Sequence, residues 1–259
     1  MSVAPAAQAR SSIGSAAGGR SLGSYLLMPL LLAGVLLALY LYVSNQELDS
    51  IEARTLTFPR ILNAARDHVL LAAASTVITL LIAIPLGIML TRPFARRIRA
   101  YVIGVLTVLQ AVPTIAVLVL LAVVFLILGF WIAIIGLVLY AIVPVLLNTM
   151  VGIEQVDDNV LEAGRGMGMS KATVLRRIEL PLSIPVMLAG IRTALVINVG
   201  TATLATYINA GGLGDIISAG LATNRFTIQL VGAVLTSVLA LLIDYLAGVV
   251  EEVLRPRGL

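Results

Sequence analysis

Long apolar stretches separated by short polar segments run through the chain from residue 23 to residue 259. Each stretch holds about 20 residues or more, the length of helix that crosses about 30 Å of hydrocarbon. Five stretches are predicted to span a membrane: about 24–43, 68–90, 131–150, 185–208 and 228–250. Residues 1–22 are rich in Ala, Ser and Gly and lack a periodic apolar pattern, which predicts a disordered cytoplasmic tail. The sequence therefore predicts an all-α polytopic membrane protein with one transmembrane domain over residues 23–259.

A sixth apolar run, about residues 101–126, is long for one span and contains Pro113. Two full crossings would need about 40 residues. Two interpretations remain: one helix kinked at Pro113, or a re-entrant piece followed by a span. The first stretch, 24–43, is too long for the apolar part of a signal peptide and no A-x-A site follows it, so it is interpreted as an uncleaved span. About six spans are expected in all.

Composition supports this prediction, since hydrophobic residues make up 60% and charged residues 12% of the chain. Average globular domains have about half and about a quarter. The mean hydropathy is +1.07 and the pI about 9.8. A basic chain is a candidate for nucleic-acid binding, but the distribution of its charges along the predicted spans points elsewhere.

The basic residues fall unequally on the two sides of the predicted membrane. Twelve lie on one side: Arg10, Arg20, Arg92, Arg96, Arg97, Arg99, Arg165, Lys171, Arg176, Arg177, Arg255 and Arg257. Four lie on the other, Arg54, Arg60, Arg66 and Arg225, and Arg192 lies within a span, so that 12 + 4 + 1 accounts for all 17. By the positive-inside rule, both termini and the polar segment 151–184 are cytoplasmic. The basic pI therefore reflects membrane topology, and no nucleic-acid partner is expected.

The polar segment 151–184 reads as a helix, a turn and a second helix in water. The residues that can cap the first helix are Asp157, Asp158 and Asn159. Gly168 can take the left-handed conformation that ends it, and Ser170 can cap the second helix. Pro181 is expected to prevent that second helix from continuing in register.

This segment is interpreted as a docking loop for a soluble partner. The alternative is an amphipathic connector lying on the membrane surface. Met167 and Met169 beside Gly168 favour docking, because flexible thioether side chains are expected to be exposed there and suit a socket in another protein.

The spacing of this loop resembles the EAA loop of permease subunits of ATP-binding-cassette (ABC) importers. The pattern begins at Glu162 and ends at Pro181. More narrowly, five segments resemble the osmoprotectant permeases: 139–149, 163–169, 190–194, 200–205 and 211–215. Two positions depart from the pattern: Gly164 replaces the second alanine, and Leu147 stands where relatives often carry arginine before Asn-Thr.

The resemblance implies a type I ABC importer permease in the cell membrane of a prokaryote, carrying glycine betaine, choline or carnitine without a cofactor. It implies three partners besides the lipid bilayer: an ATP-binding-cassette ATPase, an extracytoplasmic substrate-binding protein, and a second copy of the chain or a sister permease. The residues that it assigns to ATPase coupling are Glu162, Ala163, Gly164, Met167, Gly168, Met169, Ile178, Leu180 and Pro181.

Polar residues inside the spans are candidates for the translocation pathway, because ionisable groups in hydrocarbon are costly. Arg192 and Asp244 both lie about 10 Å below the predicted inner surface. They either pair or reach the interface separately. Asn148, Asn198 and Gln110 either line a path or form interhelical hydrogen bonds.

The glycine-rich segment 211–215 is expected on the outer side. By resemblance, Gly211, Gly212, Gly214 and Asp215 belong to an outer gate loop; the simpler interpretation is a flexible turn. The segment lacks the GxxxxGK[ST] spacing of a phosphate-binding loop. His68, the only histidine, is interpreted as an interfacial residue at a helix start.

The sequence shows no metal cluster, nucleophile triad or paired catalytic carboxylates, so ATP hydrolysis is expected on a partner and not on this chain. Two alternatives to an osmoprotectant importer remain. One is a methionine-like amino-acid permease, which would also resemble the EAA loop and the G-G-L-G-D segment. The other is a secondary carrier, for which internal repeats and unwound, charge-lined helices are expected; this sequence shows no internal repeat, and charges within its spans are sparse.

Overall fold

The computed structural model describes residues 22–254, so the tail predicted for residues 1–22 lies outside the described part except for Leu22. The α-helices are α1 (Leu22–Ser44), α2 (Ser50–Thr55), α3 (Phe58–Leu90), α4 (Arg96–Ala111), α5 (Thr114–Phe125), α6 (Phe130–Glu154), α7 (Asp158–Gly166), α8 (Lys171–Val174), α9 (Leu180–Ala202), α10 (Gly214–Thr223) and α11 (Phe226–Leu254). Short 3-10 helices occupy Pro93–Ala95 and Thr203–Ile208, and a π-helical turn occupies Leu175–Glu179.

The described residues contain five helices that are long and apolar enough to cross a membrane. A sixth crossing can come from the bent pair Pro93–Ala111 and Thr114–Phe125, whose halves meet at 99°. The bend lies at Pro113, the position at which the sequence predicts a break. The prediction of an all-α polytopic fold with about six spans is confirmed.

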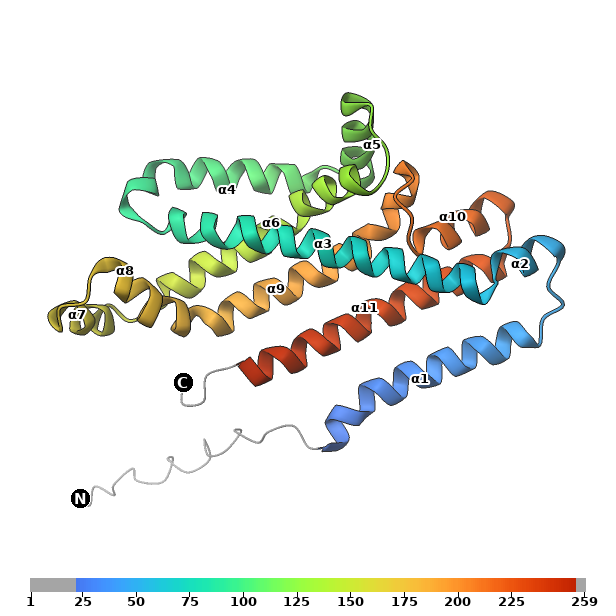
Figure 1. Cartoon of the computed structure of the whole chain (residues 1–259), viewed down its shortest axis with the longest axis horizontal. Helices are drawn as coiled ribbons and strands as arrows, with labels where there is room; N and C mark the ends of the chain where they lie inside the picture. Colours follow the sequence, from blue (N-terminus) through green and yellow to red (C-terminus); the bar gives the residue numbers. More distant parts are fainter. Residues whose placement is uncertain (1–21, 255–259) are drawn as a thin grey trace, which may run out of the picture.

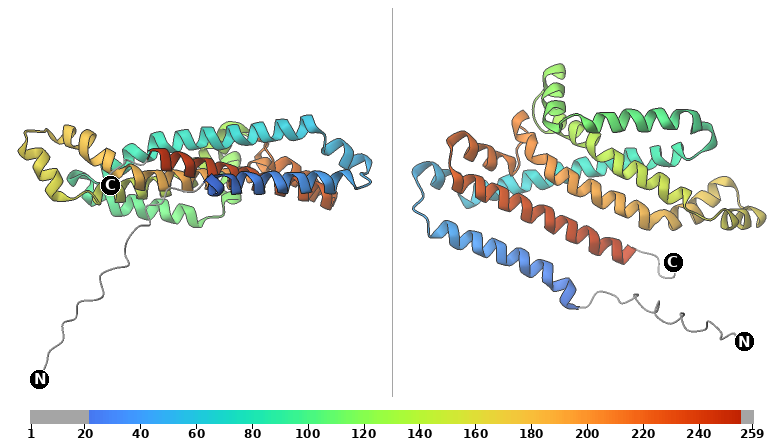
Figure 2. Two further views of the ribbon diagram at one scale, coloured as in Figure 1. Left: turned by 90° about the horizontal axis from the view of Figure 1, so that it is seen from below. Right: turned by 180° about the vertical axis from the view of Figure 1, so that it is seen from behind.

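Helix α6 forms the centre of the bundle, between α3 and α9 (Figure 1). Of its most apolar 18-residue window, 67% is buried, against 6% for α1. Gly190 of α9 allows the close approach to α6, since a Cβ there would lie 2.6 Å from that of Asn148 and 2.7 Å from the Pro144 carbonyl oxygen. Helix α1 lies at the edge of the bundle beside α11 (Figure 2). The chain thus has a tightly packed core of three helices and a loosely attached first helix.

A proline inside a helix leaves the carbonyl four residues earlier without its N–H donor. In α6, Pro144 leaves the carbonyl of Tyr140, which accepts a hydrogen bond from Gln110 Nε2 at 2.7 Å. The Tyr140 hydroxyl in turn donates to the carbonyl of Val112, at the break between α4 and α5. Of the two interpretations of Gln110, the structure supports the interhelical hydrogen bond.

The same arrangement recurs at the edge of the bundle. Pro29 in α1 leaves the carbonyl of Tyr25, and the Tyr245 hydroxyl of α11 donates to that oxygen at 2.9 Å. Apolar surroundings make an unpaired carbonyl costly. Side chains of neighbouring helices therefore stabilise both of these kinks.

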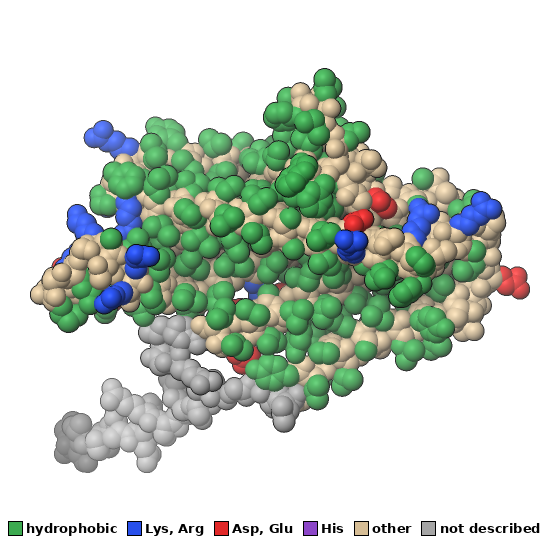
Figure 3. Space-filling view, in the orientation of Figure 1, with side chains coloured by type: hydrophobic (Ala, Val, Ile, Leu, Met, Phe, Trp, Pro, Cys, Tyr) green, Lys and Arg blue, Asp and Glu red, His purple; other side chains and the backbone are tan. Residues whose placement is uncertain are grey.

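Charged side chains gather at the two ends of the bundle, and apolar ones cover the middle (Figure 3). The middle band includes side chains as exposed as Leu81 at 70% and Val105 at 68%. Contiguous apolar surface on this scale is typical of contact with lipid. One end carries α7 and α8, the other α2 and α10 (Figure 1).

Two helices differ most from their predicted ranges. Helix α3 begins at Phe58, ten residues before the predicted start at 68. Helix α9 follows the π turn without interruption, so that Lys171–Ile208 is one helical stretch of 38 residues. Pro181 lies in the first turn of α9, where its missing N–H is tolerated. The helix thus continues through Pro181, but the π turn just before it changes the hydrogen-bond register.

Candidate functional site

Residues 157–180 form a hairpin of α7, α8 and the π turn, here called the α7–α8 hairpin, which protrudes from one end of the bundle (Figure 1). The Asp157 carboxylate accepts from the backbone N–H of Asn159 at 2.8 Å and caps α7. Ser170 Oγ accepts from the N–H of Thr173 at 3.3 Å and caps α8. Between the two helices Gly168 has φ +85°, the left-handed conformation that the sequence predicts for it.

The two sides of the α7–α8 hairpin meet at Gly164. A Cβ on this residue would lie 2.7 Å from Cδ1 of Ile178 and 3.7 Å from the sulfur of Met169. The Gly164 carbonyl also accepts from the N–H of Met169 at 3.2 Å. Gly164, the departure from the EAA pattern, is therefore the point at which the hairpin closes.

The remaining residues assigned to coupling divide into two groups. Exposed ones are Glu162, Ala163, Met167 and Gly168, and half-buried ones are Met169, Ile178, Leu180 and Pro181. Met167 is 71% exposed. The sequence predicts that both methionine side chains are exposed. Met167 is exposed, but Met169 turns back toward Gly164.

An ion pair joins the hairpin to the bundle. Glu179, in the π turn, is 4% exposed and binds Arg92, which follows α3, through both carboxylate oxygens, at 2.5 and 3.3 Å. The Ser183 hydroxyl donates to the backbone carbonyl of Glu179 at 2.5 Å. A second pair, Arg99 with Glu154, lies close by. Sequence reasoning did not assign either pair, although an acidic residue in the I-E-L-P segment next to an apolar span is a signal that could have pointed to one.

Arg192 of α9 and Asp244 of α11 form a two-bond ion pair. Nε donates to Oδ1 at 2.6 Å and Nη2 donates to Oδ2 at 2.7 Å. Glu251 lies farther away, 3.8 Å from Nη1. Gly248 leaves room for the guanidinium, since a Cβ there would lie 3.4 Å from Cζ of Arg192. Of the two interpretations left open by the sequence, the structure shows the pair.

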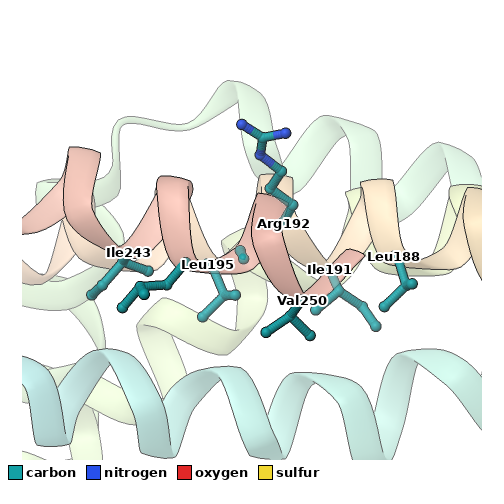
Figure 4. Close-up of a pocket in the computed structure, with 8 residues that line it drawn as sticks. Leu188, Ile191, Arg192, Leu195, Ile243 and Val250 are labelled. Carbon is teal, nitrogen blue, oxygen red and sulfur yellow. The ribbon is translucent and has the colours of Figure 1, made fainter. Parts of the chain in front are cut away.

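An apolar groove of about 260 Å³ lies beside this pair. It is lined by Leu188, Ile191, Arg192, Leu195, Ile243, Leu246, Ala247 and Val250. In Figure 4 the guanidinium of Arg192 points away from the labelled apolar side chains. The groove therefore offers a hydrocarbon surface and does not present a charge to a solute.

Asn198 and Asn148 both form hydrogen bonds in this conformation. Asn198 is fully buried. With its amide turned so that both atoms are satisfied, its oxygen accepts from Thr76 Oγ1 of α3 at 2.9 Å and its nitrogen donates to the Leu137 carbonyl of α6 at 3.2 Å. Asn148 is half-buried and donates to the carbonyl of Pro144 at 2.8 Å. Asn198 therefore links α9 to α3 and α6, whereas Asn148 bonds within its own helix.

The 209–215 loop, which follows the 3-10 helix Thr203–Ile208 and leads into α10, makes several close contacts with its surroundings. Gly211 and Gly212 have φ +82° and +100°, which other residues rarely adopt. Thr206 Oγ1 donates to Asp215 Oδ1 at 2.5 Å. Gly214 is buried against Thr203, and Leu213 is 1% exposed. The loop residues assigned from the sequence are thus held in one compact unit.

His68 lies inside the fold, and its interpretation as an interfacial residue is wrong. Its side chain is fully buried. Nε2 lies 2.9 Å from the Val199 carbonyl oxygen, and Nδ1 accepts from the backbone N–H of Leu213 at 3.2 Å. The error arises because α3 begins ten residues earlier than the apolar pattern indicates, at Phe58, which places His68 in the third turn.

Across residues 22–254 no group of three or more His, Cys, Asp or Glu side chains could hold a metal ion. The polar clusters of the described chain are ion pairs and hydrogen-bonded contacts between helices.

Two solved structures share this architecture. An inward-facing form of the MetNI methionine ABC transporter matches with a TM-score of 0.67 at 21% identity, over 77% of this chain and 99% of that one. An amino acid ABC transporter crystallised with histidines matches with a TM-score of 0.66 at 19% identity, over 80% and 99%. The fold is therefore that of a type I ABC importer permease.

Residues 83–256 match the family described as binding-protein-dependent transport system inner membrane component. The chain belongs to this family, whose members are multi-pass inner-membrane permeases of ABC importers.

Curated relatives cover most of the chain. The carnitine transport permease protein OpuCD of Listeria monocytogenes is 45% identical over 192 residues, 73% of this chain and 84% of that protein. The choline transport system permease protein OpuBB of Bacillus subtilis is 38% identical over 202 residues, 74% and 88%. The osmoprotectant import permease protein OsmY of Salmonella typhimurium is 39% identical over 223 residues, 86% and 93%.

Proposed function

We propose that this chain is the membrane-spanning subunit of an ATP-driven importer for small quaternary ammonium osmoprotectants such as glycine betaine, choline or carnitine. The observation that carries the proposal is 45% identity to a carnitine permease over 73% of this chain, together with similar matches to choline and osmoprotectant permeases. The solved amino acid and methionine transporters are only 19–21% identical, so their substrates do not favour the alternative of an amino-acid permease.

ATP hydrolysis takes place on a separate ATPase subunit, and the α7–α8 hairpin docks onto it. Three features support this role: the hairpin protrudes from one end of the bundle (Figure 1), it presents Met167 at 71% exposure, and Gly168 adopts the left-handed conformation at its turn. The Arg92–Glu179 ion pair connects the π turn to the end of α3. A displacement of the hairpin is thereby transmitted to both α9 and α3.

The α7–α8 end is cytoplasmic, as are both termini. Basic residues support this orientation, because those following α3 and those of the hairpin gather at one end of the bundle, as the positive-inside rule requires. The α2–α10 end then faces outward and receives substrate from an extracytoplasmic binding protein. The 209–215 loop at that end is the outer gate, and a second copy of the chain or a sister permease completes the pathway.

The pathway opens along α9. Arg192, Asp244, Asn148 and Asn198 belong to it: Arg192 holds α9 against α11, Asn198 holds α9 against α3 and α6, and Asn148 bonds within α6 where Gly190 of α9 packs on it. In this role they control access and do not bind the cation, because both carboxylate oxygens of Asp244, the one acidic side chain among them, are already bonded to Arg192.

The test is reconstitution of the chain with an ATPase and a substrate-binding protein of the same organism, followed by uptake of labelled glycine betaine, choline and carnitine. ATP-dependent uptake of at least one of them, not reduced by excess methionine, is expected. Uptake of methionine with no uptake of the three osmolytes would reject the proposed substrate class. Uptake that continues without the ATPase would indicate a secondary carrier.

A further inference from the structure

We infer that His68 is the positioning residue of the outer gate: it holds the C-terminal end of α9 and the 209–215 loop against α3, so that these three segments move as one body during transport. The inference rests on the proposed function for the gate, but its geometry and its first test do not depend on the substrate. His68 contributes two long-range hydrogen bonds from one fully buried side chain.

The first bond stabilises the end of α9. In an α-helix the Val199 carbonyl would accept from the N–H of Thr203, but that N–H is directed to the carbonyls of Gly200 and Thr201 as the helix tightens into a 3-10 segment. The imidazole Nε2 approaches the Val199 oxygen to 2.9 Å. A side chain of α3 thus supplies the partner at the point where the α-helical pattern of α9 ends.

The second bond holds the 209–215 loop. Leu213 N–H donates to Nδ1 at 3.2 Å, which requires an unprotonated Nδ1. Nε2 then carries the proton and donates to Val199. The two backbone partners together select one neutral tautomer, and neither ring nitrogen is left for another role.

The 209–215 loop packs closely against the imidazole. A Cβ on Gly212 would lie 3.1 Å from Nδ1, closer than ordinary side chains approach. Leu213 and Ile216 pack with Ala64 of α3 and Ile228 of α11 in one buried cluster. Interiors packed in this way have discrete arrangements and do not deform continuously. Gate opening therefore carries the 209–215 loop with α3.

The first test measures amide hydrogen exchange of the peptide covering residues 209–216 in the assembled importer. His68→Leu fills similar space without either hydrogen bond, and exchange there should rise about tenfold or more through local opening. His68→Gln retains a donor and an acceptor and should preserve most of the protection. Leu71→Ala, one turn away and equally buried, is the control for general destabilisation and should not selectively expose this peptide.

The second test asks whether the loop must leave α3 during transport. A Cβ on Gly211 would lie 3.6 Å from Cβ of Asp67 in α3, within the separation that a disulfide bridges. The chain has no cysteine, so Asp67→Cys with Gly211→Cys gives a single defined cross-link. Asp67→Cys and Gly211→Cys alone, and the reduced double variant, control for strain at the left-handed position 211.

If His68 holds these segments together, the oxidised double variant should transport at a rate similar to its reduced form. In a His68→Leu background, oxidation should restore both protection of residues 209–216 and transport. Transport that stops on oxidation and returns on reduction would overturn the inference, because the loop would then have to separate from α3. Unchanged exchange in His68→Leu would overturn it independently.

These outcomes remain separable from the substrate proposal. Hydrogen exchange and disulfide formation are measured without any transported solute. A wild-type importer that carries none of the osmolytes would reject the substrate class. Amide hydrogen exchange would still test the role of His68. Loss of protection without any loss of transport would reject the role of His68 in gating and leave the substrate class untouched.

Discussion

Arg192 and Asp244 meet face to face across α9 and α11, with two hydrogen bonds of 2.6 and 2.7 Å. Their side chains are 35% and 32% exposed, so the pair lies at the surface of this single chain, where the surrounding residues are apolar. The pair faces lipid or a second permease. In such surroundings the two opposite charges together cost less free energy to bury than either charge alone.

Removing either partner is therefore expected to destabilise the folded subunit. Removing one partner of a buried ion pair lowers the free energy of unfolding by about 3–5 kcal/mol, and removing one partner of an exposed pair lowers it by at most about 1 kcal/mol. Since this pair is a third exposed, about 1–2 kcal/mol is expected for Asp244→Asn. Arg192→Gln should be worse, because it leaves Asp244 near Glu251 with no cation between them. Thermal unfolding in detergent measures both.

The double variant Arg192→Gln with Asp244→Asn should recover part of the loss, and the size of the recovery is the coupling between the two residues. Thr193→Ala, on the exposed face of α9 beside Arg192, is the control and should change little. Losses that simply add in the double variant would show that the side chains act independently.

Gly166 and Gly168 form a matched pair for testing the turn of the α7–α8 hairpin. A Cβ has open space at both, but only Gly168 has a positive φ, +85°. Gly168→Val should leave membrane insertion intact and reduce transport to less than about a tenth, because left-handed backbone is strained for a β-branched residue. Gly166→Ala should transport near the wild-type rate, since alanine favours the helix end by about 0.5–1 kcal/mol.

For these two variants, uptake is measured together with the amount of protein in the membrane. The comparison separates an effect on folding from an effect on coupling. Normal transport by Gly168→Val would contradict the docking role given to the turn. If transport falls equally in both variants, the cause would be the added side chain and not the backbone conformation.

Glu179 should be more sensitive than Glu154, although each pairs with an arginine. The Glu179 side chain is 5% exposed and that of Glu154 is 39% exposed. Glu179→Gln leaves Arg92 without its charge partner in a buried site, so ATP hydrolysis stimulated by substrate should fall severalfold. Glu154→Gln breaks an exposed pair worth about 0–1 kcal/mol and should have little effect. The ratio of stimulated to basal hydrolysis is the measurement, and an equal fall in both variants would argue against transmission through Glu179.

Much of the fold follows directly from the sequence, because membrane spans require long apolar stretches. The break at Pro113 and the left-handed Gly168 were also predictable, since each depends on the backbone of a single residue type. The start of α3 was not, because residues 58–67 are polar enough to look like a loop and become helical only through contacts such as that of Ala64 with Leu213 and Ile216.

The parts of the site that escaped prediction depend on pairings across long sequence separations. His68 reaches Val199 and Leu213, more than 130 positions away, and nothing local marks it as buried. Glu179 reads as an exposed acid of the loop until Arg92 is placed beside it. The sequence places Arg192 and Asp244 at a similar depth in the membrane, which makes them candidate partners. Their hydrogen bonds could not be predicted without knowing how α9 packs on α11.

The hydrogen bonds around Pro144 give a last prediction. Gln110 Nε2 is the donor to the Tyr140 carbonyl that Pro144 leaves free, and the Tyr140 hydroxyl holds the carbonyl of Val112 before Pro113. Gln110→Leu should therefore cost about 1–3 kcal/mol, because a buried carbonyl loses its donor. Adding Pro144→Ala should restore most of the stability, since residue 144 would then donate to that carbonyl itself. Pro144→Ala alone is the control. Thermal unfolding of the four proteins measures the cycle, and a double variant no more stable than Gln110→Leu would show that Gln110 stabilises the bundle by packing and not through this carbonyl.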